Sequence, residues 1–372
     1  MNKIFLLFSL FIITSCRRNN VSKTKSESTY SIQGKINGRD SGWVFLGSDD
    51  TTSRTQMILF DSAKIDSSYF HFHGDLAKPL IAKIMIKSQS AIPSYTSNFA
   101  LDTGLTIVHL YKDSMANSFI TGTPLQKSLN GFNQKLYELE ISFDNNFALN
   151  RNGKITTDSL NKLQHAFYRD KHNLIQQQIK SNPSAVTSAF VAAQVLPDQP
   201  DLPTLETICI ALGNVNNYYS THLQEVLAAK KQSRPGMQAP SFSITDNKNR
   251  VLTNNSFRGK YVFLVFWASW CEPCREENPG LVKLYEMYAY KGIEFVGISI
   301  DMDKKNWENA ITKDNLPWIQ ACDLKGSQSK IFNDFGLYDI PANFLIDTDG
   351  KIVAKDLSVA KLEEIVSKRL GG

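Results

Sequence analysis

Cysteine is scarce in this sequence, with five residues in a chain of 372. A chain of this length can bury a sizeable core without disulfide staples, so a small disulfide-dense scaffold is excluded. There is no second Cys-x-x-Cys pair and no Cys/His pair to complete the four ligands of a zinc site, so we predict no metal and no cofactor. Basic residues are scattered and the net charge is only +5, so nucleic acid is not an expected partner.

Long apolar runs are equally rare, and the one at the N-terminus, "IFLLFSLFII", is too short for a transmembrane helix. It follows Lys3 and ends just before Cys16, a pattern typical of a secretory signal. The stretch resembles a bacterial lipoprotein signal, which implies removal of residues 1–15 and lipidation of Cys16. An ordinary secretory signal with an incidental cysteine is the alternative. Residues 16–29 are polar and basic, which predicts a tether.

The pattern of apolar and polar residues changes twice after the tether. Residues 30–123 contain short alternating runs between turn residues, which predicts an all-β, sandwich-like domain. Within it, "YFHFHG" puts His71 and His73 on one strand face. We favour a solvated face over a metal site there, because no third ligand is nearby in sequence. Residues 124–233 carry apolar residues at three- and four-residue spacing, which predicts a helical segment.

Residues 237–372 alternate between strand and helix patterns. The run "KYVFLVFW" is continuously apolar, as is typical of a strand buried on both faces. "IEFVGISID" is a second such strand, and "ANFLIDTDGKIVAKD" predicts a hairpin before a closing helix. We therefore expect an α/β domain with a central mixed sheet flanked by helices.

A Cys-x-x-Cys pair stands in "FWASWCEPCREENP", at the turn between the first buried strand and its helix. A helix N-terminus favours a thiolate, so we expect Cys271 to be an exposed nucleophile with a pKa below the usual value of about 8.5. Cys274 lies one turn later, where it can resolve a mixed disulfide. Pro273 suits the first helical turn, and the charge of Glu272 opposes thiolate formation.

The C-terminal part of the chain resembles the thioredoxin-fold proteins of the exported ResA/TlpA class. The resemblance rests on "APSFSITDNKNRVLTNNSFRGKYVFLVFWASWCEPCREENP" and "YDIPANFLIDTDG". It implies a thioredoxin-like fold and a thiol–disulfide oxidoreductase whose redox disulfide joins Cys271 and Cys274. The preceding residues resemble, more loosely, a β-rich domain of unknown function and a helical segment of Bacteroidetes lipoproteins, and that likeness implies no activity.

The resemblance also implies a proton carrier for Cys274. Thioredoxin usually has a buried aspartate six residues before the first cysteine, where this chain has Val265. In the ResA/TlpA class the corresponding group is a glutamate three residues after the second cysteine, here Glu277. An exposed helix glutamate without a catalytic role, as we expect for Glu276, is the alternative.

A second implied feature is the segment around Pro341. In thioredoxin folds the matching peptide bond, here Ile340–Pro341, is cis and lies beside the redox cysteines. The backbone of Ile340 would then pair with an extended client segment. An ordinary proline at the start of a strand is the alternative. Trp270 is expected to form a wall of the site, and Trp267 to lie in the core.

Two hypotheses compete with an oxidoreductase. One is a non-catalytic envelope-binding lipoprotein with a vestigial redox module, against which the intact motifs argue. The other is a thiol-dependent peroxidase, whose usual Pro-x-x-x-Thr-x-x-Cys setting is missing. We expect a lipid-anchored protein of the cell envelope that faces the periplasm, on either membrane. It would reduce disulfides of exported proteins, with apocytochrome c among the candidate clients, and would draw electrons from a membrane thiol reductant.

Overall fold

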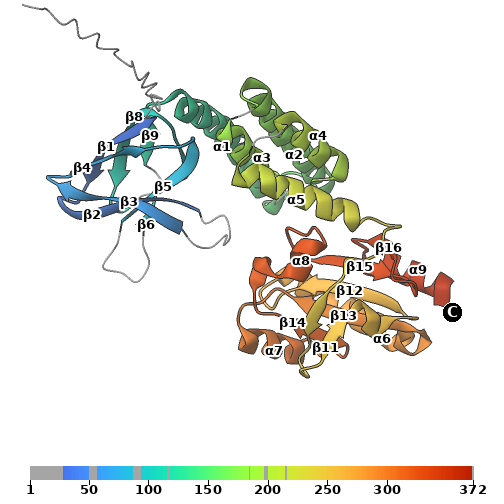
Figure 1. The fold of residues 1–372 in the computed structure, drawn as a ribbon. Coiled ribbons are helices and arrows are strands. Elements are labelled where there is room, and N and C mark those ends of the chain that lie inside the picture. The colour runs from blue at the N-terminus through green and yellow to red at the C-terminus, as the bar shows by residue number, and fades with distance from the viewer. Residues whose placement is uncertain are drawn as a thin grey trace, which may run out of the picture.

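The computed structural model describes residues 28–49, 57–86, 94–114, 118–183, 185–196, 200–213 and 216–370. The predicted signal, Cys16 and most of the tether lie outside these residues. Three parts follow one another along the chain: a β-rich part, a helical part and an α/β part (Figure 1). Within the described residues, no helix is both long and apolar enough to cross a membrane.

The β-rich part is a single sheet that curls around its own core, with the strand order β6-β5-β2-β3-β4-β1-β8-β9 (Figure 1). The all-β prediction is confirmed. The predicted sandwich-like arrangement would need two sheets packed face to face, whereas the described strands form one curled sheet. Buried and exposed side chains alternate along the strands, and this alternation forms the core. Ile32 and Ile36 of β1 and Phe70 and Phe72 of β4 all point inward. The strands are β1 (Thr29–Asn37), β2 (Ser41–Asp49), β3 (Met57–Asp66), β4 (Tyr69–Asp75), β5 (Leu80–Ile86), β6 (Ser94–Tyr95), β7 (Phe99–Leu101), β8 (Gly104–Tyr111) and β9 (Phe119–Thr121).

The helical part begins where Thr123 caps its first helix, the Thr123 side chain accepting a hydrogen bond from the Gln126 N–H. Asp201 and Asn217 cap the fourth and fifth helices in the same way. The helices surround a second apolar core, to which Ile81 and Ala100 of the β-rich part also contribute. The helices are α1 (Pro124–Arg151), α2 (Thr157–Ser181), α3 (Val186–Ala193), α4 (Leu202–Leu212) and α5 (Tyr218–Gln232).

The C-terminal part has a central mixed sheet with the order β14-β13-β12-β15-β16. Strands β12, β13 and β14 are parallel, β15 is antiparallel to β12, and β16 is antiparallel to β15. A small hairpin, β10–β11, precedes this sheet. The strands are β10 (Ser243–Thr245), β11 (Val251–Thr253), β12 (Tyr261–Trp267), β13 (Ile293–Ser299), β14 (Ile319–Cys322), β15 (Ala342–Ile346) and β16 (Ile352–Lys355). The helices are α6 (Glu272–Tyr288), α7 (Lys304–Lys313), α8 (Lys330–Asp334) and α9 (Val359–Leu370).

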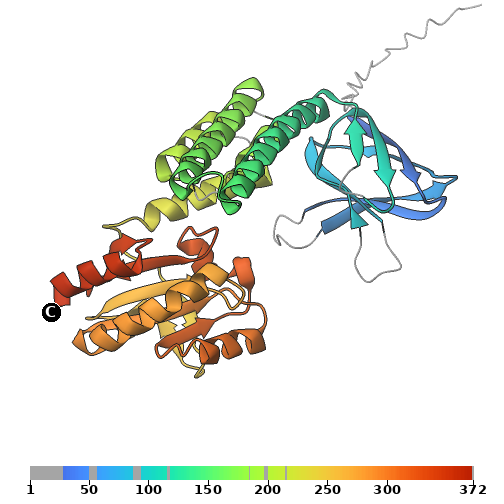
Figure 2. The same ribbon diagram turned by 180° about the vertical axis from the view of Figure 1, so that it is seen from behind.

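Helices cover both faces of this sheet, as the sequence predicts. On one face of β12, the Phe266 ring meets that of Phe332 in α8 at a centroid distance of 6.4 Å. On the other face, Phe263 packs against Phe295 of β13, which contacts Tyr285 of α6 at 5.6 Å. Figure 2 shows α6 and α9 on the same side of the sheet. The thioredoxin-like fold class is confirmed.

Candidate active site

Cys271 and Cys274 form a disulfide at the start of α6, with their Cα atoms 5.3 Å apart. Cys271 is the N-cap residue of the helix, and its Sγ accepts a hydrogen bond from the backbone N–H of Cys274 at 3.2 Å. Pro273 lies in the first turn, where its missing N–H leaves no helical hydrogen bond unmade. A sulfur at this position faces the positive end of the helix dipole, which would stabilise a thiolate after reduction.

The prediction that Cys271 is exposed is wrong for this oxidised form. Only 4% of Cys271 and 3% of Cys274 is accessible to solvent. The reason is geometric, since both residues belong to the same apolar core as β12, and the bond to Cys274 holds the Cys271 sulfur against α6. Attack by Cys271 on another disulfide therefore requires the reduced form, in which its side chain is released from Cys274.

The two tryptophans before the disulfide have opposite environments. Trp267 is buried, and its indole N–H donates to Oε1 of Gln320 at 3.1 Å. Trp270 is 64% exposed, directly before Cys271. Glu272 is also exposed. An exposed indole next to a redox disulfide offers an apolar contact for another protein chain.

The segment that carries Pro341 lies at the same end of the sheet. The Ile340–Pro341 peptide bond is cis, as expected. Ala342 pairs with Phe266 in the antiparallel register of β12 and β15, so Pro341 lies where β12 ends and the turn to Cys271 begins. Ile340 is buried in the core that contains both cysteines. The segment therefore flanks the disulfide.

Glu277 is half-buried on α6, whereas its neighbour Glu276 is exposed. Burial raises the pKa of the Glu277 carboxyl above its ordinary value of 4.5. Burial raises a carboxyl pKa because it penalises the ionised form. The side chain is thus closer to a neutral proton donor than an exposed glutamate would be. Its proposed role in catalysis stays a prediction.

A buried carboxylate that the sequence analysis missed supports the turn before Cys271. Asp301 is 2% exposed, and it accepts hydrogen bonds from the N–H and the hydroxyl of Ser269, at 2.8 and 2.6 Å. The Ser299 hydroxyl donates a third bond at 2.7 Å. One signal was available, because Asp301 lies two residues after β13, the strand next to β12, and the carboxyl ends of neighbouring parallel strands meet at one edge of the sheet.

Arg275 supports the same turn from inside α6. Its Nη1 donates to the carbonyl oxygen of Ser269 at 2.9 Å, and its guanidinium pairs with both carboxylate oxygens of Asp314, at the end of α7. Asn278 adds a bond to the same carboxylate at 2.8 Å. The planar guanidinium suits such bidentate pairing, which ties the turn and α6 to α7.

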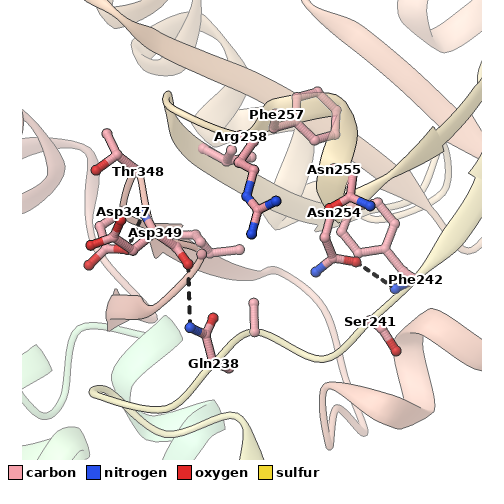
Figure 3. Close-up of a pocket in the computed structure, with 14 residues that line it drawn as sticks. Gln238, Ser241, Phe242, Asn254, Asn255, Phe257, Arg258, Asp347, Thr348 and Asp349 are labelled. Carbon is pink, nitrogen blue, oxygen red and sulfur yellow. Dashed lines mark hydrogen bonds between the residues drawn. The ribbon is translucent and has the colours of Figure 1, made fainter.

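A cavity of about 330 Å³ lies at the other end of β12, away from the cysteines (Figure 3). Val262, at the start of β12, and Ile346, at the end of β15, are among its lining residues. The Arg258 side chain projects into it, and Nε2 of Gln238 donates to the Asp349 carbonyl at 3.3 Å (Figure 3). Because no cysteine lines it, this cavity has no direct part in thiol chemistry.

Two further cysteines and the two histidines of β4 are not part of the disulfide site. Cys209 is buried in the helical core, and burial raises the pKa of its thiol to about 11. Cys322 is half-buried at the end of β14, and burial raises the pKa of its thiol as well. His71 and His73 are exposed on the outer face of β4. No group of three or more metal-ligating side chains occurs within the part of the chain that the structure describes.

Comparison with known proteins agrees with this site. The model of the AhpC/TSA family matches residues 235–355. Thiol-disulfide oxidoreductase ResA of Bacillus anthracis is 34% identical over 145 residues, which cover 39% of this chain and 82% of that protein. The chain belongs to the ResA-type family of thiol–disulfide oxidoreductases. The ResA protein of Bacillus subtilis is 28% identical over 128 residues, covering 34% of this chain and 70% of that protein.

Solved structures of similar proteins match a little over a third of this chain. A thiol-disulfide oxidoreductase from Bacteroides fragilis is 38% identical, with 34% of this chain and 98% of that chain covered and a TM-score of 0.33. A thiol:disulfide interchange protein from Bacteroides sp. is 34% identical, with 38% and 93% covered and a TM-score of 0.36. A domain of unknown function, DUF4369, matches residues 30–129. The two family models thus match separate stretches of the chain.

Proposed function

We propose that this ResA-type oxidoreductase is an exported, lipid-anchored reductant of disulfides in envelope proteins. In the reduced enzyme, the Cys271 thiolate attacks one sulfur of a client disulfide, and the other client sulfur leaves as a thiolate. The Cys274 thiolate then attacks Sγ of Cys271, which frees the second client sulfur and forms the Cys271–Cys274 disulfide. Two electrons pass from the enzyme to the client, whose two thiolates are finally protonated.

The observation that carries this proposal is the Cys271–Cys274 disulfide at the N-terminus of α6. The helix end favours the Cys271 thiolate as attacking and leaving group. The cis segment at Pro341 borders the disulfide, and its position is where an extended client segment would pair with backbone groups. The exposed Trp270 adds an apolar contact on the same side.

Glu277 is proposed to exchange a proton with Cys274. It follows Cys274 by three residues on α6, so the two side chains share one face of the helix. A carboxyl whose pKa is raised by burial keeps its proton to a higher pH than an exposed glutamate, which suits it to exchange that proton with a neighbouring thiol. Cys274 must lose a proton before it can attack Cys271, and this gives Glu277 a task in the resolving step.

The proposed location rests on the N-terminal sequence. Residues 4–13 form the apolar run that ends just before Cys16. Lipidation of Cys16 would hold the enzyme at a membrane surface facing the periplasm, where disulfide-bearing exported proteins, including apocytochrome c, are accessible. A membrane thiol reductant would return the enzyme to its dithiol form after each turnover. Replacement of Cys16 by serine should move the protein from the membrane fraction to the soluble fraction.

The test is the reduction potential of the Cys271–Cys274 couple in the full chain without residues 1–15, equilibrated with dithiothreitol or glutathione buffers. A value near that of thioredoxin, about −270 mV, or below it supports a reductant. A value near that of DsbA, about −120 mV, would make the protein an oxidant and reverse the proposed direction of electron flow.

A further inference from the structure

Helix α5 lies directly against the segment that leads from α8 to Pro341. Tyr338, in that segment, packs on the apolar core of the helical part. Its ring lies 6.4 Å from that of His222 in α5, centroid to centroid, and the His222 ring is itself stacked on Tyr218 at 5.9 Å. Figure 1 shows α5 running above α8 and the β15–β16 hairpin. An aromatic contact thus joins the two parts of the chain.

Gly336 brings the two backbones together next to this aromatic contact. A Cβ atom on Gly336 would lie 2.6 Å from the backbone nitrogen of Lys230 and 2.9 Å from the carbonyl carbon of Ala229, both in α5. Contacts this short between a Cβ and backbone atoms cannot be relieved by turning a side chain. Gly336 also has a φ of +66°, which favours glycine. A glycine here therefore lets α5 approach more closely than any other residue would allow.

The connection that follows α5 is also fixed to the C-terminal sheet. The N–H of Gly236 donates to the carbonyl oxygen of Ile352 in β16 at 2.8 Å. The N–H of Ile352 donates in turn to the carbonyl oxygen of Met237, also at 2.8 Å. Both ends of the contact between α5 and the C-terminal part are therefore held, one by backbone hydrogen bonds and the other by Tyr338 and Gly336.

The contacted segment is the one that flanks the redox disulfide. Only Asp339 stands between Tyr338 and Ile340, and its carboxylate accepts a hydrogen bond from the Ile340 N–H at 2.8 Å. Ile340 is buried in the core that contains both cysteines, and Ala342, after Pro341, begins the pairing with β12. A displacement of Tyr338 by α5 is therefore passed within two residues to the backbone beside the disulfide.

We propose that α5 fixes the segment Gly336–Pro341 and so makes the helical part a specificity-determining element for protein disulfides. This inference deepens the function above, because it assumes that client backbone lies along this segment. A disulfide within a polypeptide needs that backbone contact, whereas a small aromatic disulfide needs only access to the Cys271 sulfur. Tyr338, His222 and Gly336 are positioning residues in this scheme, and none of them touches the reacting sulfurs.

The test compares Gly336→Ala with Gly259→Ala in the full chain without residues 1–15. Gly259 also has a positive φ, +81°, but a Cβ there meets nothing within 4 Å. Both variants carry similar backbone strain, and only Gly336→Ala pushes α5 away. The readouts are the second-order rate constants with which the pre-reduced enzyme, freed of excess reductant, reduces insulin and dithiobis-nitrobenzoate, and the reduction potential of the disulfide.

We expect Gly336→Ala to lower the rate constant for insulin by roughly tenfold or more, as misplacement of a binding element by about 1 Å does. The rate with the small disulfide and the reduction potential should match those of Gly259→Ala. Equal losses with both substrates, or none with insulin, would overturn the proposal. A wild-type enzyme inactive on both substrates would instead refute the thiol function itself.

A double-mutant cycle on His222→Ala and Tyr338→Ala keeps the proposal testable if Gly336→Ala does not fold. If each ring positions the segment only through its contact with the other ring, the double variant should lose about as much insulin activity as either single variant. Additive losses would show that the rings act independently, and the proposed coupling through the α5 contact would then be wrong.

Discussion

The carboxylate of Asp301 holds the backbone N–H and the hydroxyl of Ser269, two residues before the redox cysteine Cys271. Asp301 is buried and also accepts from Ser299, so three donors depend on one side chain. The turn that delivers Cys271 to the helix end is therefore held by a group on the neighbouring strand.

Replacement of Asp301 by asparagine should destabilise the C-terminal part by about 1.5–3 kcal/mol, because the amide cannot accept all three hydrogen bonds and loses the charge. The midpoint of urea unfolding measures this change. The exposed Asp349, whose side chain has no part in the turn, provides the control variant Asp349→Asn. A loss of the same size in both variants would contradict the specific role of Asp301.

The order of attack by the two cysteines predicts different outcomes for their serine variants. Cys271→Ser should abolish disulfide reduction, because no thiolate remains to attack the client. Cys274→Ser should accumulate a mixed disulfide between Cys271 and the client, visible on a non-reducing gel and by mass. Cys209→Ser, in the helical core, should behave as wild type in this assay. A mixed disulfide trapped by Cys271→Ser instead would reverse the assignment.

Glu277→Gln should change the pH dependence of both stability and rate. The pKa of Glu277 is raised by burial, so the folded state favours the protonated form. The stabilisation of the folded state by the protonated carboxyl is fully present below pH 4.5. It is lost as the pH rises through the raised pKa of Glu277 in the folded protein. The free energy of unfolding of Glu277→Gln minus that of the wild type should therefore be larger at about pH 7 than at about pH 3.5.

The rate readout separates a proton carrier from a merely half-buried glutamate. If Glu277 exchanges a proton with Cys274, Glu277→Gln should slow the resolving step and flatten its pH profile. The exposed Glu276 gives the matched control Glu276→Gln, which should leave the profile unchanged. A shift in stability alone, with an unaltered pH profile of the resolving step, would refute the proton role.

Trp270→Ala should weaken client binding with little effect on folding. The side chain is 64% exposed, so its removal should cost no more than about 0.5 kcal/mol of stability. Loss of an indole from a binding surface should raise KM for a protein disulfide several-fold. Tyr290, 78% exposed beyond the far end of α6, gives the control Tyr290→Ala. An unchanged KM in Trp270→Ala would remove Trp270 from the client surface.

The elements of the C-terminal part were predictable because their signals are local. Strands β12 and β13 are continuous apolar runs, and the β15–β16 hairpin has its turn in the sequence. Strand β3 was not predicted, since its first half places the apolar residues Ile58, Leu59 and Phe60 at exposed positions. A register shift opposite Leu46 further breaks the alternation on which strand prediction depends.

The residues that hold the turn before Cys271 were harder to predict from the sequence than the cysteines themselves. Asp301 and Ser269 are 32 residues apart, and Arg275 and Asp314 are 39 apart. Spacing rules describe neighbours within one helix or strand, so they cannot relate residues that only the sheet brings together. The burial of Cys271 likewise follows from the packing of α6 on β12 and from its bond to Cys274.

The three apolar cores have a consequence for the way the molecule melts. Each gathers mainly residues of one part of the chain, and the redox disulfide belongs to the C-terminal core alone. Heating should therefore produce more than one calorimetric transition, so that a single melting temperature does not describe the protein. Reduction of the disulfide should shift the midpoint temperature of one of these transitions. The shifted transition would be the unfolding of the C-terminal part, which contains the disulfide.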